Sequence, residues 1–229
     1  MNQNVQNYTG AAGSGMLAER NRVLRNTYWL LALSMVPTVL GAYIGVQTGI
    51  TAGLSGGIGI IVFLAGAFGF MFAIEKFKNS AAGVPILLAF TFFMGLMLAR
   101  LLGMVLGLNN GGSLIMMAFA GTGAIFFGMA SLTTVIKRDL SSMGKFLFIG
   151  MIMLIVAGIA NIFIQSSALM ITLSVLAIGI FSAFILYDLK RVQDGEETNY
   201  ISATLGVYLS LYNVFQSLLT ILGLTSSND

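Results

Sequence analysis

One carboxylate stands where a long apolar run ends, a position at which a protein can exchange protons or cations with a membrane surface. Asp188 lies in the segment FILYDLKRVQDGEETNY, and four of the chain's eight acidic residues fall within the ten positions from Asp188 to Glu197. A carboxylate at such a boundary either takes part in proton or ion chemistry or pairs with the basic loop beside it. We therefore take Asp188 as a candidate pH or ion gate.

A second set of polar residues lies in the last apolar run of the chain. These small and polar residues recur at intervals of three or four, so they share one face of a helix. A helix otherwise built of Leu, Val, Ile and Phe does not turn such a face toward lipid. The pattern predicts a central helix whose polar face either packs tightly or borders a water-accessible path. The residues of this face are Ser202, Gly206, Ser210, Asn213, Ser217 and Thr220.

The residue types that are missing exclude several classes of membrane enzyme. The chain has no His and no Cys, which excludes Ser-His and HExxH proteases, thiolate chemistry and disulfides. A two-aspartate protease needs facing acids, but only Glu75 and Asp188 come near hydrocarbon, both at ends of apolar runs. We expect a protein that is not an enzyme and has no metal or cofactor.

The composition places these residues in an integral membrane protein made of helices. Hydrophobic residues make up 57% of the chain and charged residues only 8%, far from the average of soluble proteins. Continuous apolar runs about 20 residues long predict transmembrane helices rather than the strands of a barrel. Seven spans are predicted: Thr27–Gln47, Ala52–Ile74, Ala81–Leu106, Leu114–Ile136, Phe146–Ile164, Ala168–Tyr187 and Tyr200–Gly223.

The basic residues predict the orientation of these spans. Ten of the eleven lie before span one or after spans two, four and six, and only Arg100 lies within a span. By the positive-inside rule the N-terminus is cytoplasmic and the C-terminus periplasmic. Residues 1–26 then form a flexible cytoplasmic tail, 27–223 the transmembrane domain and 224–229 a short external tail. The net charge of +3 follows from this topology, so it does not indicate nucleic-acid binding.

The same topology selects candidate charge partners for Asp188. Arg100 is expected near the opposite face of the bilayer and cannot easily reach that carboxylate. The candidate partners on the cytoplasmic side are Lys76, Lys78 and Lys190.

The chain is also rich in glycine, with 28 residues of this type. Glycines within membrane spans let helix backbones approach closely. We expect such contacts at Gly103 and Gly107 and at Gly66 and Gly69.

Several segments together resemble the Bax inhibitor-1 family over nearly the whole chain. The resemblance implies a bundle in which six helices surround a central seventh. The final segment is the most specific. The segments are LRNTYWLLAL from Leu24, KRDLSSMGKFL from Lys137, GIANIFIQ from Gly158, ILYDLKRV from Ile185 and GEETNYISATLGVYLSLYNVFQSLLTILG from Gly195.

Within that family the chain is similar to a bacterial inner-membrane branch described as modulating FtsH, a membrane-bound ATP-dependent protease. This resemblance implies a regulatory protein with FtsH as its partner. Family members that leak calcium use two aspartates as a gate, and Asp188 matches the first of them. Ser210 occupies the position of the second, so a gate of the usual kind lacks one carboxyl group. The alternative hypothesis is a pH-sensitive leak of Ca²⁺ or H⁺ through the bundle.

Overall fold

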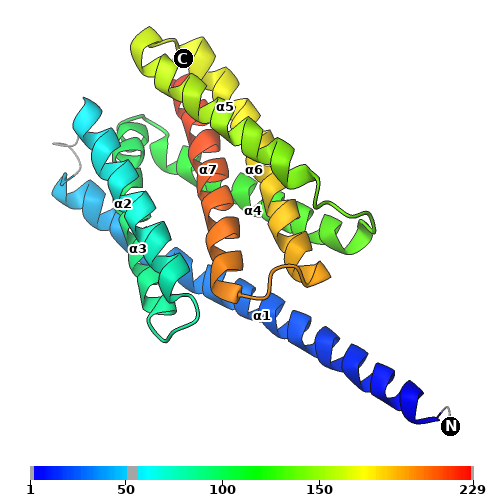
Figure 1. Cartoon of the computed structure of the whole chain (residues 1–229). Helices are drawn as coiled ribbons and strands as arrows, with labels where there is room; N and C mark the ends of the chain where they lie inside the picture. The colour runs from blue at the N-terminus through cyan, green and yellow to red at the C-terminus, as the bar shows by residue number, and fades with distance from the viewer. Residues whose placement is uncertain (1–2, 51–55, 228–229) are drawn as a thin grey trace.

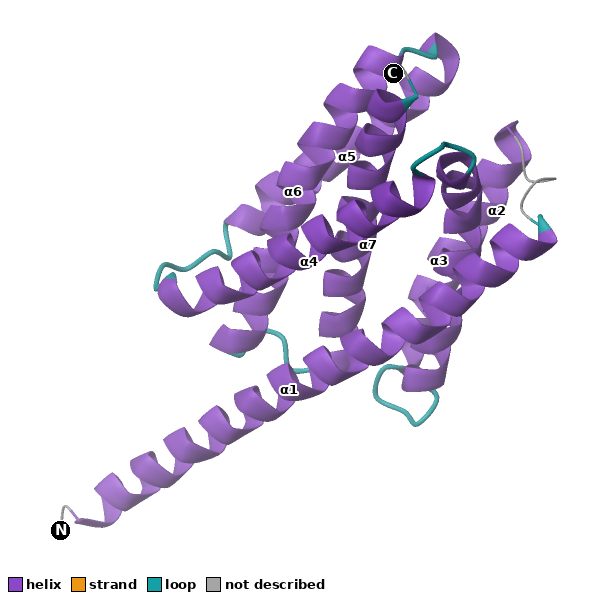
Figure 2. Ribbon diagram, turned by 180° about the vertical axis from the view of Figure 1, so that it is seen from behind, coloured by secondary structure: helices purple, strands orange, loops and turns teal. Residues whose placement is uncertain are grey.

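A computed structural model describes residues 3–50 and 56–227, with side chains from Ala18 onward except at residues 51–57 and 60. Each of the seven elements in this part of the chain is a helix, and no strand occurs among the described residues (Figures 1 and 2). The prediction of seven helices is confirmed. They are α1 (Gln3–Thr48), α2 (Gly56–Phe77), α3 (Gly83–Leu106), α4 (Gly111–Val135), α5 (Met143–Ile164), α6 (Ser167–Asp194) and α7 (Tyr200–Ser226).

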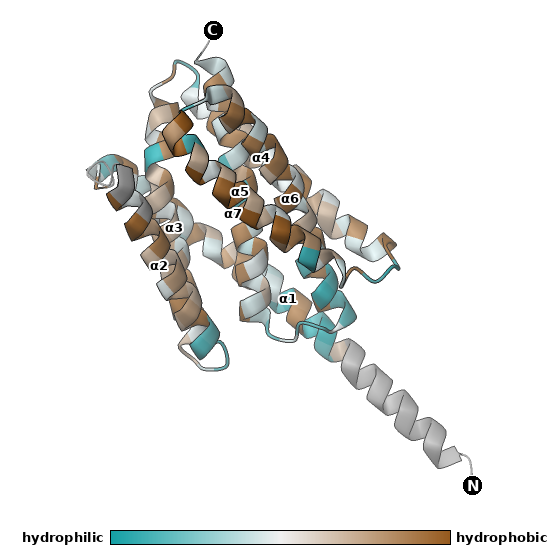
Figure 3. Ribbon diagram, turned by 45° about the horizontal axis from the view of Figure 1, so that its top comes forward, coloured by the Kyte–Doolittle hydropathy of each residue, from teal (hydrophilic) through white to brown (hydrophobic). Residues whose placement is uncertain are grey.

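Six of these helices are long and apolar enough to cross a membrane, among the residues that the structure describes. The six are α1 from Ala18, then α3, α4, α5, α6 and α7. Part of α2 lies among the residues without described side chains, and the predicted start of its span at Ala52 lies outside the described residues. Figure 3 shows hydrophobic residues along the helices and hydrophilic ones toward their ends. The chain is therefore a multi-pass helical membrane protein.

Two helices are longer than the apolar runs from which they were predicted. Helix α1 begins at Gln3, so it includes most of the segment assigned to a cytoplasmic tail, whose flexibility stays a prediction. Helix α6 continues past Tyr187 to Asp194, because Lys190 and Asp194 form an ion pair one turn apart and Gly195 ends the helix with φ of 82°. Asp188 therefore lies within α6, six residues or about 9 Å before its end, and does not end the helix as expected.

Helices α1 and α3 cross with their backbones in contact. A Cβ atom at Gly95 of α3 would collide with the carbonyl oxygen of Thr38, and one at Gly41 of α1 would collide with the carbonyl oxygen of Phe92. One helical turn on, a Cβ at Gly45 would lie 2.5 Å from the Cβ of Ala99. These positions form the small-xxx-small pattern that permits close approach of membrane helices.

The glycines predicted to make such contacts behave differently. No atom outside the local helix lies within 4 Å of a Cβ built at Gly69 or Gly103, and at Gly107 only carbonyl oxygens of the preceding turn do. Gly66 alone faces another helix, where the ring of Phe93 fills the space. The prediction is therefore wrong at three of these four positions, because glycine spacing within one helix does not reveal which face has a partner.

Helix α7 lies between two groups of helices (Figures 1 and 2). In one group α3 packs against α1 and α2, and in the other α6 packs against α4 and α5. Helix α7 contacts every one of these helices except α5, which packs only on α6 within the described residues. The prediction that six helices surround a seventh is thus not confirmed. Val207, Tyr208 and Val214 of α7 are almost completely buried in the main hydrophobic core.

The crossing of α1 and α3 yields a prediction with a matched control in the same helix. Gly95→Ala should lower the free energy of unfolding in detergent micelles by about 1–3 kcal/mol, because the new methyl group displaces the backbone of α1. Gly103→Ala has open space around the new methyl group and should be neutral or stabilising by up to about 1 kcal/mol, as Ala favours the helix. Equal effects of the two substitutions in a denaturant titration would contradict the close crossing.

Candidate functional site

The carboxylate of Asp188 lies against the bare backbone of α7. A Cβ atom built at Gly206 would lie 2.8 Å from Oδ2 of Asp188, so only glycine leaves room for this carboxylate in its present position. No hydrogen bond or ion pair of Asp188 occurs among the described residues. The structure thus brings together two of the predicted residues, Asp188 and Gly206, at the contact of α6 with α7.

The lysines proposed as partners of Asp188 interact with other groups. The Lys78 ammonium contacts Glu75 three residues earlier in the chain, and Lys190 Nζ lies 2.7 Å from Oδ1 of Asp194. Lys76 lies over the ring of Phe77, 5.6 Å from its centroid. Each lysine interacts with a residue on or next to its own helix, and the structure brings none of the three to Asp188.

Arg191 also pairs with the loop between α6 and α7. Its guanidinium lies 3.7 Å from Glu196 and 3.9 Å from Glu197, and it packs over the ring of Tyr187. The acidic residues of this loop are therefore matched by basic residues at the end of α6.

Asp139 in the loop between α4 and α5 accepts a hydrogen bond from the Ser141 N–H, which lowers the pKa of that carboxyl.

Apolar packing covers Asp188 on the side of this loop. Val192, one turn beyond Asp188 in α6, forms a buried cluster with Val23 of α1 and Ala203 of α7. The side chain of Arg20 in α1 packs over the end of α6. A Cβ atom built at Gly195 would lie 2.6 Å from Nε of Arg20. Three helices thus meet between the loop and the carboxylate.

Asn199 fastens the same loop to two other parts of the molecule. Its side-chain oxygen caps α7 by accepting hydrogen bonds from the N–H groups of Ile201 and Ser202, at 2.9 and 3.1 Å. Its amide nitrogen donates to Asn79 Oδ1 at 2.8 Å, in the loop between α2 and α3. The sequence analysis missed this residue, although an Asn directly before an apolar helix is a typical N-cap signal.

The polar face of α7 is largely buried, and two of its polar side chains bond within their own helix. Ser210 is 4% exposed, and Ser217 and Thr220 are also buried. Asn213 donates to the carbonyl of Leu209 and Thr220 to that of Gln216, both at 2.8 Å. The hydroxyl oxygen of Ser202 is the one buried side-chain polar atom without a hydrogen-bond partner in the described part of the chain.

Ser210 follows Gly206 by one turn, about 6 Å along the same face of α7. The row from Asp188 past Gly206 to Ser210 therefore runs along the contact between α6 and α7. A carboxylate at this place can hold a proton or attract a cation. No group of three metal-ligating side chains occurs among the described residues.

The opposite face of α7 carries two tyrosines that the sequence analysis missed. The Tyr208 hydroxyl is 2.9 Å from the Thr38 hydroxyl of α1 and 3.4 Å from the Thr91 carbonyl of α3. Tyr212 donates to the carbonyl of Met94 at 3.3 Å. The signal was present in the sequence, because two phenols four residues apart in a membrane span must both find partners. Tyrosine contacts on one side and the polar face on the other hold α7 between the two groups of helices.

Comparison with known proteins finds a family model and relatives that cover most of the chain. The family model described as "Inhibitor of apoptosis-promoting Bax1" matches residues 20–228. A membrane protein of Vibrio cholerae is 37% identical over 226 residues, which cover 99% of this chain and 100% of the relative. The Escherichia coli K12 protein named "Modulator of FtsH protease YccA" is 37% identical over 92% of this chain and 93% of its own length. The corresponding protein of Escherichia coli O6:H1 is named "Inner membrane protein YccA" and has the same identity and coverage.

Proposed function

The chain belongs to the Bax inhibitor-1 family, and we propose that it is an inner-membrane regulatory protein that binds and modulates an FtsH-type ATP-dependent protease. The observation that carries this proposal is the identity of 37% over 92% of the chain with a protein named as a modulator of that protease.

The chemistry of the bundle supports regulation by binding rather than catalysis. The chain contains neither His nor Cys, and no group of three metal-ligating side chains occurs among the described residues. A protein without catalytic groups can still act on a protease by occupying it or by limiting its access to other substrates.

Helix α1 provides a segment for such an interaction. It extends well beyond the bundle toward the N-terminus, on the side of the loop between α6 and α7 (Figure 1). We propose that this end is cytoplasmic and the C-terminus periplasmic, because the basic residues gather at the ends of α2, α4 and α6 and near the start of the α1 span. The protruding part of α1 would then be accessible to an ATP-driven protease acting from the cytoplasm.

Deletion of residues 1–18 tests the role of this segment. We expect the deletion to weaken co-purification with the protease at least severalfold and to slow this protein's own turnover, because the segment that the protease grips has been removed. A matched control replaces residues 2–18 by a Gly/Ser chain of equal length, which separates the effect of length from that of sequence. If the deletion changes neither readout, engagement through the segment is wrong. If the full chain also fails to co-purify and leaves degradation of a reference membrane substrate unchanged, the regulatory function itself is wrong.

A second candidate function is a pH-sensitive leak of Ca²⁺ or H⁺ through the bundle. The observation in its favour is the carboxylate of Asp188, which lies within the helices against Gly206 without an ion-pair partner among the described residues. The argument against it is Ser210, a neutral hydroxyl where leaking members of the family are expected to carry a second acid. A lone carboxylate lacks the like-charge interaction that lets two carboxyls share a proton.

Flux measurements in proteoliposomes separate the two functions. We expect the parent protein to pass no more Ca²⁺ or H⁺ than empty vesicles at acidic or neutral pH, because one carboxyl is missing. Ser210→Asp should create a leak, and adding Asp188→Asn to that variant should abolish it. A parent protein that leaks, and whose leak is abolished by Asp188→Asn alone, would instead make conduction the function.

A further inference from the structure

The chain's single tryptophan lies on α1 between two open grooves. Trp29 is 73% exposed. One groove of about 490 Å³ is lined by Asn21, Leu24, Arg25, Tyr28, Trp29 and Ala32. The second, of about 530 Å³, lies on the other side of Trp29 and reaches Asn26, Leu33 and Tyr200.

The lining of these grooves changes from polar to apolar along α1. Asn21 and Arg25 lie toward the N-terminal end, Tyr28 and Trp29 one turn further, and Leu33 one turn beyond. The distance from Arg25 to Leu33 along the helix is about 12 Å. A basic group followed by aromatic rings and then aliphatic side chains reproduces the order of a phospholipid: phosphate, glycerol and acyl chain.

Arg25 has the charge to hold a phosphate at this place. Its side chain is exposed, and it forms no ion pair with an acidic residue in the described part of the chain. The arginine lies at the end of the bundle where the other basic residues gather, which is the level of the lipid headgroups. A guanidinium donates two parallel hydrogen bonds to a phosphate.

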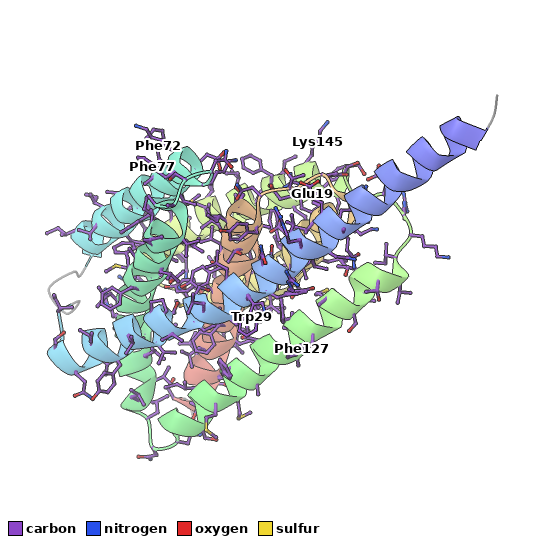
Figure 4. All side chains as sticks on the ribbon, turned by 90° about the horizontal axis from the view of Figure 1, so that it is seen from below. Glu19, Trp29, Phe72, Phe77, Phe127 and Lys145 are labelled. Carbon is purple, nitrogen blue, oxygen red and sulfur yellow. The ribbon has the colours of Figure 1, made fainter. Side chains whose placement is uncertain are left out.

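The grooves are lined by residues of α1 and by Tyr200 of α7. The backbones of α1 and α4 make no contact within the described residues, and the edge of the Tyr28 ring packs against Phe126, with centroids 6.0 Å apart. Figure 4, which looks along the bundle from below, shows α1 and α4 running alongside each other, with Trp29 on the first and Phe127 on the second. Both labelled side chains are exposed, so the space beside Trp29 is open to the membrane.

We propose that the grooves beside Trp29 form a binding site for an anionic phospholipid. The Arg25 guanidinium and the Asn21 amide hold its phosphate, and an acyl chain lies along Tyr28, Trp29 and Leu33. The occupant is a lipid rather than a partner helix, because the charged group lies at one end of the groove and the apolar surface below it, at the depths of headgroup and chain. Basic pockets at the membrane boundary select anionic headgroups over zwitterionic ones.

The single tryptophan provides the test. The full-length protein is placed in phosphatidylcholine vesicles that contain the same small fraction of either brominated phosphatidylglycerol or brominated phosphatidylcholine. Bromine quenches a nearby indole, so preferential binding appears as stronger quenching of Trp29 by the anionic lipid. We expect an apparent preference of about fivefold for phosphatidylglycerol, from the attraction of one arginine for an anionic headgroup.

Three variants assign this preference to the groove. Arg25→Gln should bring the quenching by the two lipids close to equality, and Arg25→Lys should retain most of the preference. Lys145→Gln removes an equal charge from α5, on the far side of the bundle from Trp29 (Figure 4), and should leave the preference intact. Equal quenching by the two lipids in the parent protein would overturn the proposal. The same conclusion would follow if Arg25→Gln had no effect or if Lys145→Gln had an equal one.

Discussion

Polar groups inside a hydrocarbon layer must be matched within the protein, and this constraint decides where α7 lies. The helix carries hydroxyls, two amides and three phenols within its length. Its tyrosine face bonds to α1 and α3 through Thr38, Thr91 and Met94. On its polar face Asn213 and Thr220 bond to the helix's own backbone, and Ser210, Ser217 and Thr220 are buried. Any position at the edge of the bundle would expose one of these faces to lipid.

Asp188, like the Ser202 hydroxyl, lacks such a partner among the described residues. Its carboxylate lies against Gly206 without a bond or ion pair among the described residues, although Lys190 and Arg191 form ion pairs with acidic residues at the end of the same helix. An unmatched carboxylate within a membrane helix is costly and usually marks a functional position. The cluster of Val23, Val192 and Ala203 lies between it and the loop side, and Asp188 itself is partly exposed. The segment of α1 that we propose as the contact for a protease continues from this same cluster.

Much of the architecture could be predicted from apolar runs alone, because a span needs a length and a composition that few other segments have. The interior position of Ser210 and Ser217 could also be predicted, from their spacing. The end of α6 could not be predicted, because charged residues such as Lys190 and Asp194 are typical of a loop. In the structure these two residues form an ion pair one turn apart, which stabilises the helix. The ion-pair partners of the lysines could not be predicted either, nor could the glycines that lie at helix contacts. Both depend on which helices become neighbours, and periodicity within one helix does not contain that information.

Disulfide cross-linking in native membranes can show whether Asp188 faces Gly206 across the contact of α6 and α7. The chain has no cysteine of its own, so paired substitutions report on one distance each. Asp188→Cys combined with Gly206→Cys should form a disulfide on mild oxidation. Asp188→Cys combined with Tyr208→Cys should not, because residue 208 points about 200° around α7 from residue 206. Efficient cross-linking of the second pair and none of the first would contradict the account.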